Sequence, residues 1–387
     1  MAGNVDESTS LSELRPLPSR NPNAPALKSY VTSMTRDYSR ISDTAVAMDC
    51  YVISRIESCL ASIRHTLATM PPCTPFVIAD YGAADGVNEC QLFGRIVNGI
   101  HTANPLLKIR LVYADIADRA PFETFWEQSP LSELDYVEAE YIQGSFYESL
   151  VPEGSVNLGF SSTALHWLDT KSRDAAFFRH PDCIQANQIP MPECTRFIET
   201  WKSDWRKFFY ERSREVAAGG MLFLSNLTSL GADQWPASAG YNNLRDICIA
   251  LCREGRISNE ELQAIFIPDY FATPDEMRAL VGEDAIRQHF SLQRMETMTI
   301  PCAYFSRMGN SIDDPRQRRE LTHTLARVVR AWSESSLRVG LSRGHAGLVD
   351  EIYSRLEDRF YKEPKGLPYQ YCLMELKRRE LREPDSS

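Results

Sequence analysis

Two acidic residues, each at the end of an apolar run, are the main chemical signal in this 387-residue sequence. Asp80 closes one such run and begins the turn Asp80–Asn88, in which Gly82 can adopt backbone angles that other residues resist. A second run, Ile109–Tyr113, ends close to Asp115. A carboxylate at the end of the second strand of a nucleotide-binding fold suits the hydroxyl groups of a ribose. The pattern therefore predicts a site for a nucleoside.

The turn after the first run lacks the sequence GxGxxG, and no lysine follows it as in a P-loop. Dinucleotides and nucleoside triphosphates are therefore disfavoured as ligands, and so is a dehydrogenase. A nucleoside that carries positive charge and no phosphate fits better, and S-adenosylmethionine has these properties. The alternative is that Asp80 and Asp115 only cap helices or end strands. Either residue alone favours that interpretation, whereas the two in this order favour the cofactor.

Strands and helices must alternate to bring these residues together. Apolar residues recur at spacings of three and four between Ile53 and Leu67, which predicts a long helix before the first strand. This alternation through the first half predicts an α/β fold with a parallel sheet. The second half is mostly helical in pattern. The further predicted strands are Tyr136–Ile142, Val156–Phe160, Met221–Leu224, Phe290–Ile300 and Tyr369–Leu376.

Charge and composition exclude several classes of partner. The chain has 52 acidic and 42 basic residues and a net charge of −10, so it lacks the broad basic field of a nucleic-acid-binding protein. Its ten cysteines include no CxxC pair, which argues against a disulfide framework and a zinc site. The N-terminal residues lack the apolar stretch of a secretion signal, and no apolar run approaches the roughly 18 residues of a membrane span. We therefore expect a cytoplasmic protein with no membrane or nucleic-acid partner.

Several motifs in a fixed order make the sequence similar to a known family. It resembles the SABATH family of S-adenosylmethionine-dependent methyltransferases, the salicylate, benzoate and theobromine type, which methylate carboxyl groups or ring nitrogens of small metabolites. The resemblance begins near Tyr38 and covers most of the chain. The motifs are Tyr38–Ser42, Asp80–Asn88, Asp115–Ile116, Gly144–Tyr147, Ser161–Leu168, Phe208–Phe209 with Arg212, Glu215 and Gly219–Met221, Ile267–Tyr270, and Arg330–Ala331.

The resemblance implies a cofactor site for S-adenosyl-L-methionine. Asp80 would lie near its methionine end, Asp115 would accept from both ribose hydroxyls, and Tyr38 would reach toward the methyl group. Ile116 and Phe146 would enclose the adenine between them. The residues that the resemblance assigns to cofactor binding are Tyr38, Ser42, Asp80, Gly82, Asn88, Asp115, Ile116, Ser145 and Phe146.

On the acceptor side the sequence departs from the family. Ala45 stands where carboxylate methylators have a glutamine, and Thr163 stands where they have an aromatic residue, which argues against a flat, salicylate-like acid. Trp167 is retained, and the resemblance makes its indole N–H a donor to the acceptor carboxylate. His166 could hold an acceptor oxygen, take a proton from a nitrogen nucleophile, or simply pack in the core. The residues expected to bind substrate are Tyr38, Thr163, His166, Trp167 and Tyr241, and the expected catalytic residues are Trp167 and His166.

No metal is expected. Some family members have a magnesium site near an Asn-x-Pro segment of the cap, and the matching acidic and amide ligands are missing from Gln263–Pro268.

The expected fold is a Rossmann-like class I methyltransferase core, with a mostly parallel seven-stranded sheet, and a mainly helical cap. The expected boundaries are a mobile tail at 1–28, a core at 29–230 with about 286–305 and 366–378, and cap segments at 170–192, 231–285 and 306–365.

Carboxyl O-methylation of a small acid in specialised metabolism is the function we expect first. The alternatives are N- or hydroxyl methylation of a small metabolite, or an inactive relative that binds a ligand. Family members are often homodimers, so the resemblance leaves a homodimer as one of the possible oligomeric states.

Overall fold

The computed structural model describes residues 43–232, 234–341 and 346–380. The predicted tail at 1–28 and two of the predicted site residues, Tyr38 and Ser42, lie outside these ranges.

A seven-stranded sheet runs through the molecule in the order β3-β2-β1-β4-β5-β7-β6. Neighbours among the first five strands in this order are parallel, and β7 is antiparallel to both β5 and β6. The predicted α/β fold with a mostly parallel sheet is therefore confirmed. The strands are β1 (Phe76–Tyr81), β2 (Ile109–Asp115), β3 (Val137–Gln143), β4 (Val156–Ser162), β5 (Val216–Leu227), β6 (Phe290–Ile300) and β7 (Tyr369–Arg378).

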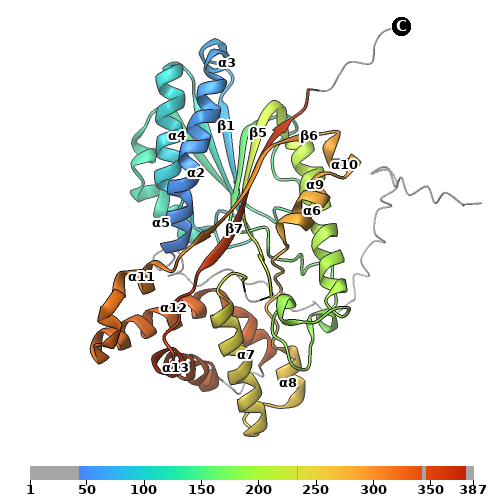
Figure 1. Cartoon of the computed structure of the whole chain (residues 1–387). Coiled ribbons are helices and arrows are strands. Elements are labelled where there is room, and N and C mark those ends of the chain that lie inside the picture. The colour runs from blue at the N-terminus through green and yellow to red at the C-terminus, as the bar shows by residue number, and fades with distance from the viewer. Residues whose placement is uncertain (1–42, 233, 342–345, 381–387) are drawn as a thin grey trace, which may run out of the picture.

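Helices cover both faces of the sheet, as Figure 1 shows. The α-helices are α2 (Asp43–Ser62), α3 (Arg64–Thr69), α4 (Cys90–Ala103), α5 (Ala120–Gln128), α6 (Thr195–Glu215), α7 (Ser238–Arg253), α8 (Asn259–Ala264), α9 (Pro274–Val281), α10 (Asp284–Arg287), α11 (Ala303–Met308), α12 (Pro315–Gly340) and α13 (Ala346–Lys362). The 3-10 helices are η2 (Pro130–Glu133), η3 (Ala175–Phe178), η4 (Ala186–Gln188) and η5 (Gly309–Asp313).

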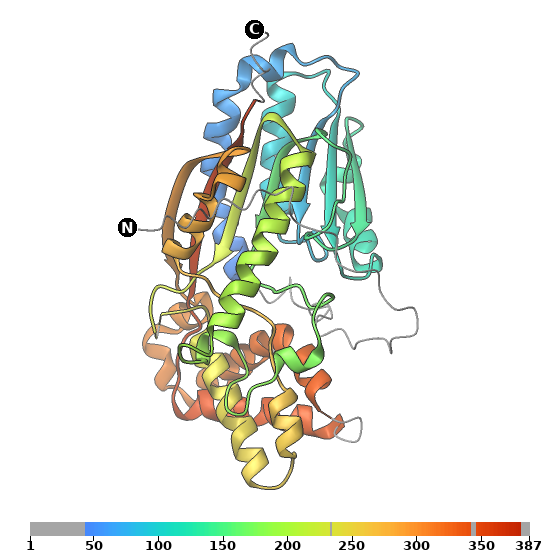
Figure 2. The same cartoon turned by 90° about the vertical axis from the view of Figure 1, so that its right-hand side faces the viewer.

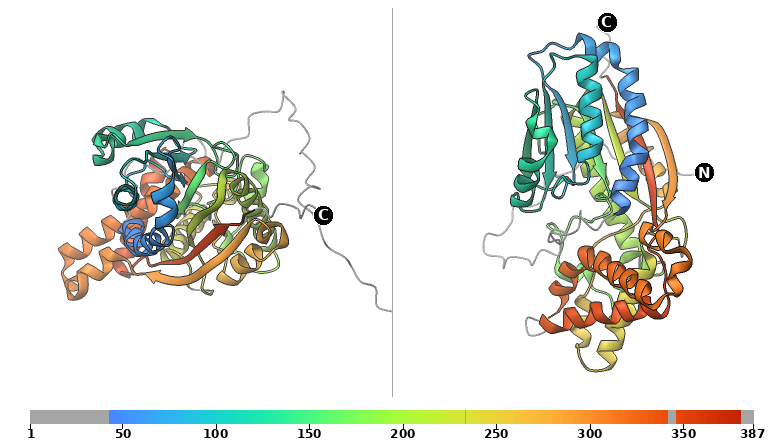
Figure 3. Two further views of the ribbon diagram at one scale, coloured as in Figure 1. Left: turned by 90° about the horizontal axis from the view of Figure 1, so that it is seen from above. Right: turned by 90° about the vertical axis from the view of Figure 1, so that its left-hand side faces the viewer.

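The buried side chains of the sheet divide between two apolar clusters, one on each face. All six residues of β1 are buried, as expected for a central strand of a parallel sheet. Successive residues of a strand point to opposite faces, and accordingly Ile78 belongs to the cluster under α2 and α4, whereas Val77 belongs to the cluster under α6. Figure 2 shows helix α6 along one face of the sheet, and Figure 3 shows helices α2 and α4 along the opposite face. This packing fixes the strand ends that carry the predicted cofactor residues.

A second group of helices, α7, α8, α12 and α13, gathers beyond one end of the sheet, in the lower part of Figure 1. These helices lie within the predicted cap segments. Helix α9 differs, because its residues Met277 and Leu280 pack in the same cluster as Trp205 of α6 and Leu224 of β5. We therefore propose that the cap ends before α9 and that residues from α9 onward to β6 belong to the core.

None of the helices within the described ranges combines the length and the apolar character needed to cross a bilayer.

Candidate active site

Asp115, at the end of β2, is held by backbone donors from two turns. The backbone N–H of Ala84 donates to its Oδ2 and that of Ala117 donates to its Oδ1, both at 2.9 Å. Burial raises the pKa of Asp115, and these hydrogen bonds act in the opposite direction. Each carboxylate oxygen keeps a further lone pair, so the group is oriented to accept from two adjacent hydroxyl groups.

The glycine turn packs closely against two other predicted site segments. Gly82 has φ +97°, and a Cβ atom there would lie 2.3 Å from the Cβ of Ala164 and 3.6 Å from the Phe146 ring. Its N–H donates to the carbonyl of Ala114 at 2.8 Å, which ties the turn to β2. Only glycine allows both this backbone conformation and this approach. The turn therefore lies directly beside Phe146.

Two further side chains of this turn match a cationic ligand. Asp80 is 1% exposed at the end of β1. Asn88 is half-buried, and its carbonyl oxygen Oδ1 is buried without a hydrogen-bond partner in the part of the chain that the structure describes. An amide oxygen accepts hydrogen bonds, as the ammonium group of a methionine moiety would require.

The loop after β3 carries Ser145 and Phe146, and hydrogen bonds from Arg212 of α6 hold it in place. Arg212, fully buried, donates to the carbonyl oxygens of Phe146 at 2.7 Å and of Glu148 at 2.9 Å. Its guanidinium also pairs with Glu215 at 2.9 Å. The N–H of Gly144, in turn, donates to the Asp115 carbonyl at 2.9 Å, which brings this loop to β2. The motif that contains Arg212 and Glu215 was visible in the sequence, but this role depends on contacts between distant segments.

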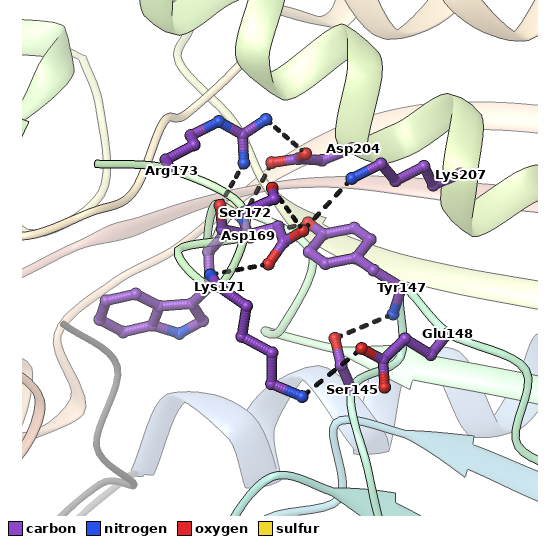
Figure 4. Close-up of polar contacts among 10 residues, drawn as sticks. Ser145, Tyr147, Glu148, Asp169, Lys171, Ser172, Arg173, Asp204 and Lys207 are labelled. Atoms are coloured by element: carbon purple, nitrogen blue, oxygen red, sulfur yellow. Dashed lines mark hydrogen bonds and ion pairs between the residues drawn. The ribbon is translucent and has the colours of Figure 1, made fainter. Parts of the chain in front are cut away.

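Tyr147 connects this loop to the segment that carries Trp167. Its N–H donates to Ser145 Oγ at 3.2 Å, and its hydroxyl donates to the Trp167 carbonyl at 2.7 Å (Figure 4). Its ring lies 4.7 Å from that of Phe146, centroid to centroid. One buried side chain therefore joins the predicted cofactor residues to the predicted acceptor residues.

Ion pairs secure the chain just beyond Trp167. Asp204, fully buried on α6, accepts from the N–H of Asp169 at 2.8 Å and from the guanidinium of Arg173 at 2.8 Å. Burial raises the pKa of Asp204 to about 6, and Arg173 opposes this rise. Lys171 lies 3.5 Å from Glu148 of the loop after β3, so the two loops are also joined at the surface (Figure 4).

Replacing Tyr147 by phenylalanine tests this connection. The variant loses the bond to the Trp167 carbonyl but keeps the N–H bond to Ser145. We expect kcat/KM for the methyl acceptor to fall roughly 2- to 12-fold, the effect of about 0.5–1.5 kcal/mol for one neutral hydrogen bond. Calorimetric titration is expected to show S-adenosylhomocysteine affinity within a factor of two of the native value. An equal loss of cofactor affinity would contradict this assignment. Tyr210→Phe, at an exposed position on α6, is the control.

The predicted acceptor residues line one cavity, whose empty space is about 320 Å³ when the part open to solvent is included. Thr163, His166, Trp167 and Tyr241 all line it, so the structure brings together the four described residues that the sequence assigned to substrate. The other lining residues are Leu227, Pro236, Ala237, Phe271, Trp332 and Tyr369. Sequence reasoning missed these, although Trp332 follows the Arg330–Ala331 motif and could have been found from it.

Thr163 has an unusual backbone conformation, with φ +54°. Positive φ is rare for a β-branched residue, and such strain concentrates at functional sites. The Thr163 N–H donates to the Ser225 carbonyl at 2.8 Å, and its hydroxyl lies 3.0 Å from the hydroxyl of Tyr371. These bonds hold the residue at the cavity wall.

Nitrogen groups without protein partners line the same cavity. His166 is 4% exposed, and its Nδ1 has no hydrogen-bond partner among the described residues. Burial lowers the pKa of His166 to about 3, so its ring is neutral at pH 7. The indole N–H of Trp332 is likewise buried without a partner in the described ranges. The cavity thus presents polar groups but, within the described chain, no ionised lining side chain.

A family model matches residues 44–378, which is most of the chain, and describes SAM dependent carboxyl methyltransferases. The chain belongs to this family. S-adenosylmethionine is the cofactor of these methyltransferases, and the donors and acceptors at the ends of β1, β2 and β3 fit it. Within the described residues, no group of three His, Cys, Asp or Glu side chains is arranged to hold a metal ion.

Two curated relatives share about a quarter of their aligned residues with this chain. A benzoic acid/salicylic acid carboxyl methyltransferase of Petunia hybrida is 27% identical over 56% of this chain and 57% of its own length. Jasmonate O-methyltransferase of Arabidopsis thaliana is 24% identical over 58% of this chain and 65% of its own. The match thus spans less than two thirds of the length of each of these two relatives.

A loganic acid methyltransferase, solved with SAH, has the same fold. Its TM-score is 0.70, with 18% identity over 92% of this chain and 99% of that one. The class I methyltransferase fold inferred from the sequence is thereby confirmed.

Proposed function

We propose that this methyltransferase transfers the methyl group of S-adenosylmethionine to the carboxylate of a small acid and releases a methyl ester. The observation that carries the proposal is the cavity lined by Trp167, Trp332 and His166, which has no ionised side chain among its described lining residues. A carboxylate is already ionised at pH 7, so it needs no base. An amine or hydroxyl acceptor would have to lose a proton.

The neutral state of His166 favours the same choice. A general base works best when its pKa lies near the working pH, whereas burial lowers the pKa of His166 to about 3. The ring can still donate or accept a hydrogen bond, and so can orient an acceptor. N- or hydroxyl methylation remains the alternative, because Ala45 and His166 depart from the carboxylate-methylating pattern.

The residues act through alignment in this mechanism. Cofactor binding supplies an activated methyl group, whose transfer to the carboxylate oxygen breaks the methyl–sulfur bond and leaves neutral products. The indole N–H of Trp167 donates to the other oxygen of the acceptor carboxylate. His166 restricts the rotation of this carboxylate. The aromatic lining removes water from the nucleophile. Holding the reacting groups in this arrangement can lower the barrier by roughly 7–11 kcal/mol.

The function is tested by supplying methyl-labelled S-adenosylmethionine with panels of carboxylic acids, amines and phenols. Mild alkali hydrolyses methyl esters but not N-methyl or methyl ether products. We expect label that requires an acid and is released by alkali. Label that resists alkali would establish the alternative acceptors. Binding of S-adenosylhomocysteine without transfer to any class would identify an inactive relative.

Replacing His166 by glutamine separates positioning from base catalysis. With a carboxylate acceptor we expect kcat/KM to fall roughly 2- to 12-fold, because one neutral hydrogen-bonding group is altered. Loss of a general base would instead cost about 100- to 10,000-fold. Measuring kcat/KM for an acid and for an amine decides between these outcomes, with exposed His65→Gln as the control.

The cytoplasmic location, the homodimer and the role in specialised metabolism stay predictions from the sequence and the family. So do the cofactor-binding, substrate-binding and catalytic roles of the site residues, including those of Tyr38 and Ser42.

A further inference from the structure

A buried carboxylate lies behind one wall of the acceptor cavity. Tyr241 of α7 lines the cavity, and its hydroxyl donates to Oδ2 of Asp269 at 2.5 Å. Asp269 is fully buried and does not line the cavity, so Tyr241 stands between the carboxylate and the cavity. No step of the proposed methyl transfer uses this pair.

The pair is built rigidly into the site. Asp269 forms an isolated antiparallel bridge with Trp167, and the N–H of the next residue, Tyr270, donates to the His166 carbonyl at 2.9 Å. On the other side, the Tyr241 ring is stacked on that of Trp332, with centroids 4.4 Å apart. The carboxylate is thus fixed relative to both residues expected to hold the acceptor.

The direction of this hydrogen bond determines what Tyr241 can offer a ligand. A tyrosine hydroxyl has one proton, and here the proton is directed at Asp269. Its oxygen can then only accept further hydrogen bonds. Indole N–H groups, such as those of Trp167 and Trp332, can only donate. The cavity therefore combines donors suited to a carboxylate with a hydroxyl oxygen that can only accept.

Burial raises the pKa of Asp269 to about 7, and hydrogen bonds from Tyr241 and Gln185 oppose the rise. A second donor directed at the Tyr241 oxygen would strengthen the Tyr241–Asp269 bond, because hydrogen bonds in a chain polarise one another. A ligand carbonyl or second carboxylate at the same place would face only the lone pairs of the Tyr241 oxygen.

We propose that the Tyr241–Asp269 pair makes this enzyme selective for hydroxy acids, whose hydroxyl group donates to Tyr241 while the carboxylate is held for methylation. The inference rests on the proposed carboxyl methylation and adds the class of acid. Asp269 is a positioning residue in this scheme, since it acts through Tyr241.

Asp269→Asn is the sharpest test, because it keeps the size of the side chain and reverses the bond. The amide N–H₂ can donate to the Tyr241 oxygen, which frees the tyrosine proton to point into the cavity. The probes are benzoate, 3- and 4-hydroxybenzoate and the two methoxybenzoates, together with the best acid of the panel and its deoxy and O-methyl analogues. The measured quantity is kcat/KM for transfer of labelled methyl groups.

We expect the native enzyme to prefer the hydroxy acid over its methoxy analogue at least tenfold. Asp269→Asn is expected to lower this ratio at least tenfold. Tyr241→Phe keeps the ring against Trp332 and removes the hydroxyl, so it is expected to abolish the preference. Asp246→Asn is the control and should leave the ratio unchanged, because Asp246 lies on the helix of Tyr241 but is partly exposed and pairs with Arg245 at 2.9 Å.

The outcomes separate the two proposals. If the native enzyme methylates no acid, the proposed function fails. If it methylates acids without preferring hydroxy acids, or if properly folded Asp269→Asn keeps the native ratio, the proposed function stands and the selectivity inference is overturned. S-adenosylhomocysteine titration checks folding of each variant, and if neither variant folds, the preference of the native enzyme decides.

Discussion

Asp115→Asn is expected to weaken S-adenosylhomocysteine binding by roughly 10- to 150-fold, which corresponds to about 1.5–3 kcal/mol for a hydrogen bond to a charged group. The native carboxylate is already oriented by N–H groups from Ala84 and Ala117, and so offers fixed lone pairs to a ribose diol. An amide replaces one acceptor by a donor, which faces either the ribose hydroxyl or a backbone N–H. Against a backbone N–H a donor meets a donor, and against the ribose hydroxyl a charge-assisted hydrogen bond is replaced by a weaker neutral one.

Calorimetric titration of the purified full chain measures this effect. Asp118→Asn is a matched control, because Asp118 lies three residues away, is exposed, and accepts only a long 3.4 Å bond from the N–H of Ala120. Its variant should bind as the native protein does. Native affinity in Asp115→Asn would remove Asp115 from the cofactor site and would leave the ribose without an identified partner at β2.

Trp167→Phe should lower kcat/KM for the acid roughly 10- to 150-fold, because about 1.5–3 kcal/mol is lost with one hydrogen bond to a charged group. The phenyl ring keeps part of the packing at the cavity wall, but it has no N–H. The Trp167 carbonyl still accepts from Tyr147, so the loop with Ser145 and Phe146 should keep its position. We therefore expect unchanged S-adenosylhomocysteine affinity.

The readout combines steady-state kinetics for the acceptor with titration of the cofactor product. Trp126→Phe removes an indole from the aromatic cluster with Phe122 and Phe125, away from the cavity, and controls for the substitution itself. A fall in cofactor affinity with acceptor kinetics preserved would show that Trp167 belongs to the cofactor half of the site.

Local sequence identifies the residues of the cofactor site better than those of the acceptor cavity. Asp115 and Gly82 adjoin apolar runs that form strands, so the local pattern places them at strand ends. Parallel strands present these ends at one edge of the sheet, which brings the loops after β1, β2 and β3 together. Tyr241, by contrast, lies on a helix whose register relative to the sheet no local pattern reveals. Its predicted position depended on the resemblance to the family.

The sequence by itself determined the alternating strands and helices, the strand-end carboxylates and the family, because each depends on neighbouring residues or on motifs in order. Only the tertiary structure decided which segments far apart in the sequence are joined by hydrogen bonds. Arg212 binds the Phe146 carbonyl across 66 residues of chain, Tyr147 binds the Trp167 carbonyl across 20, and Tyr241 binds Asp269 across 28. Such contacts depend on packing angles and side-chain directions, which are set by the whole core and not by any local stretch of sequence.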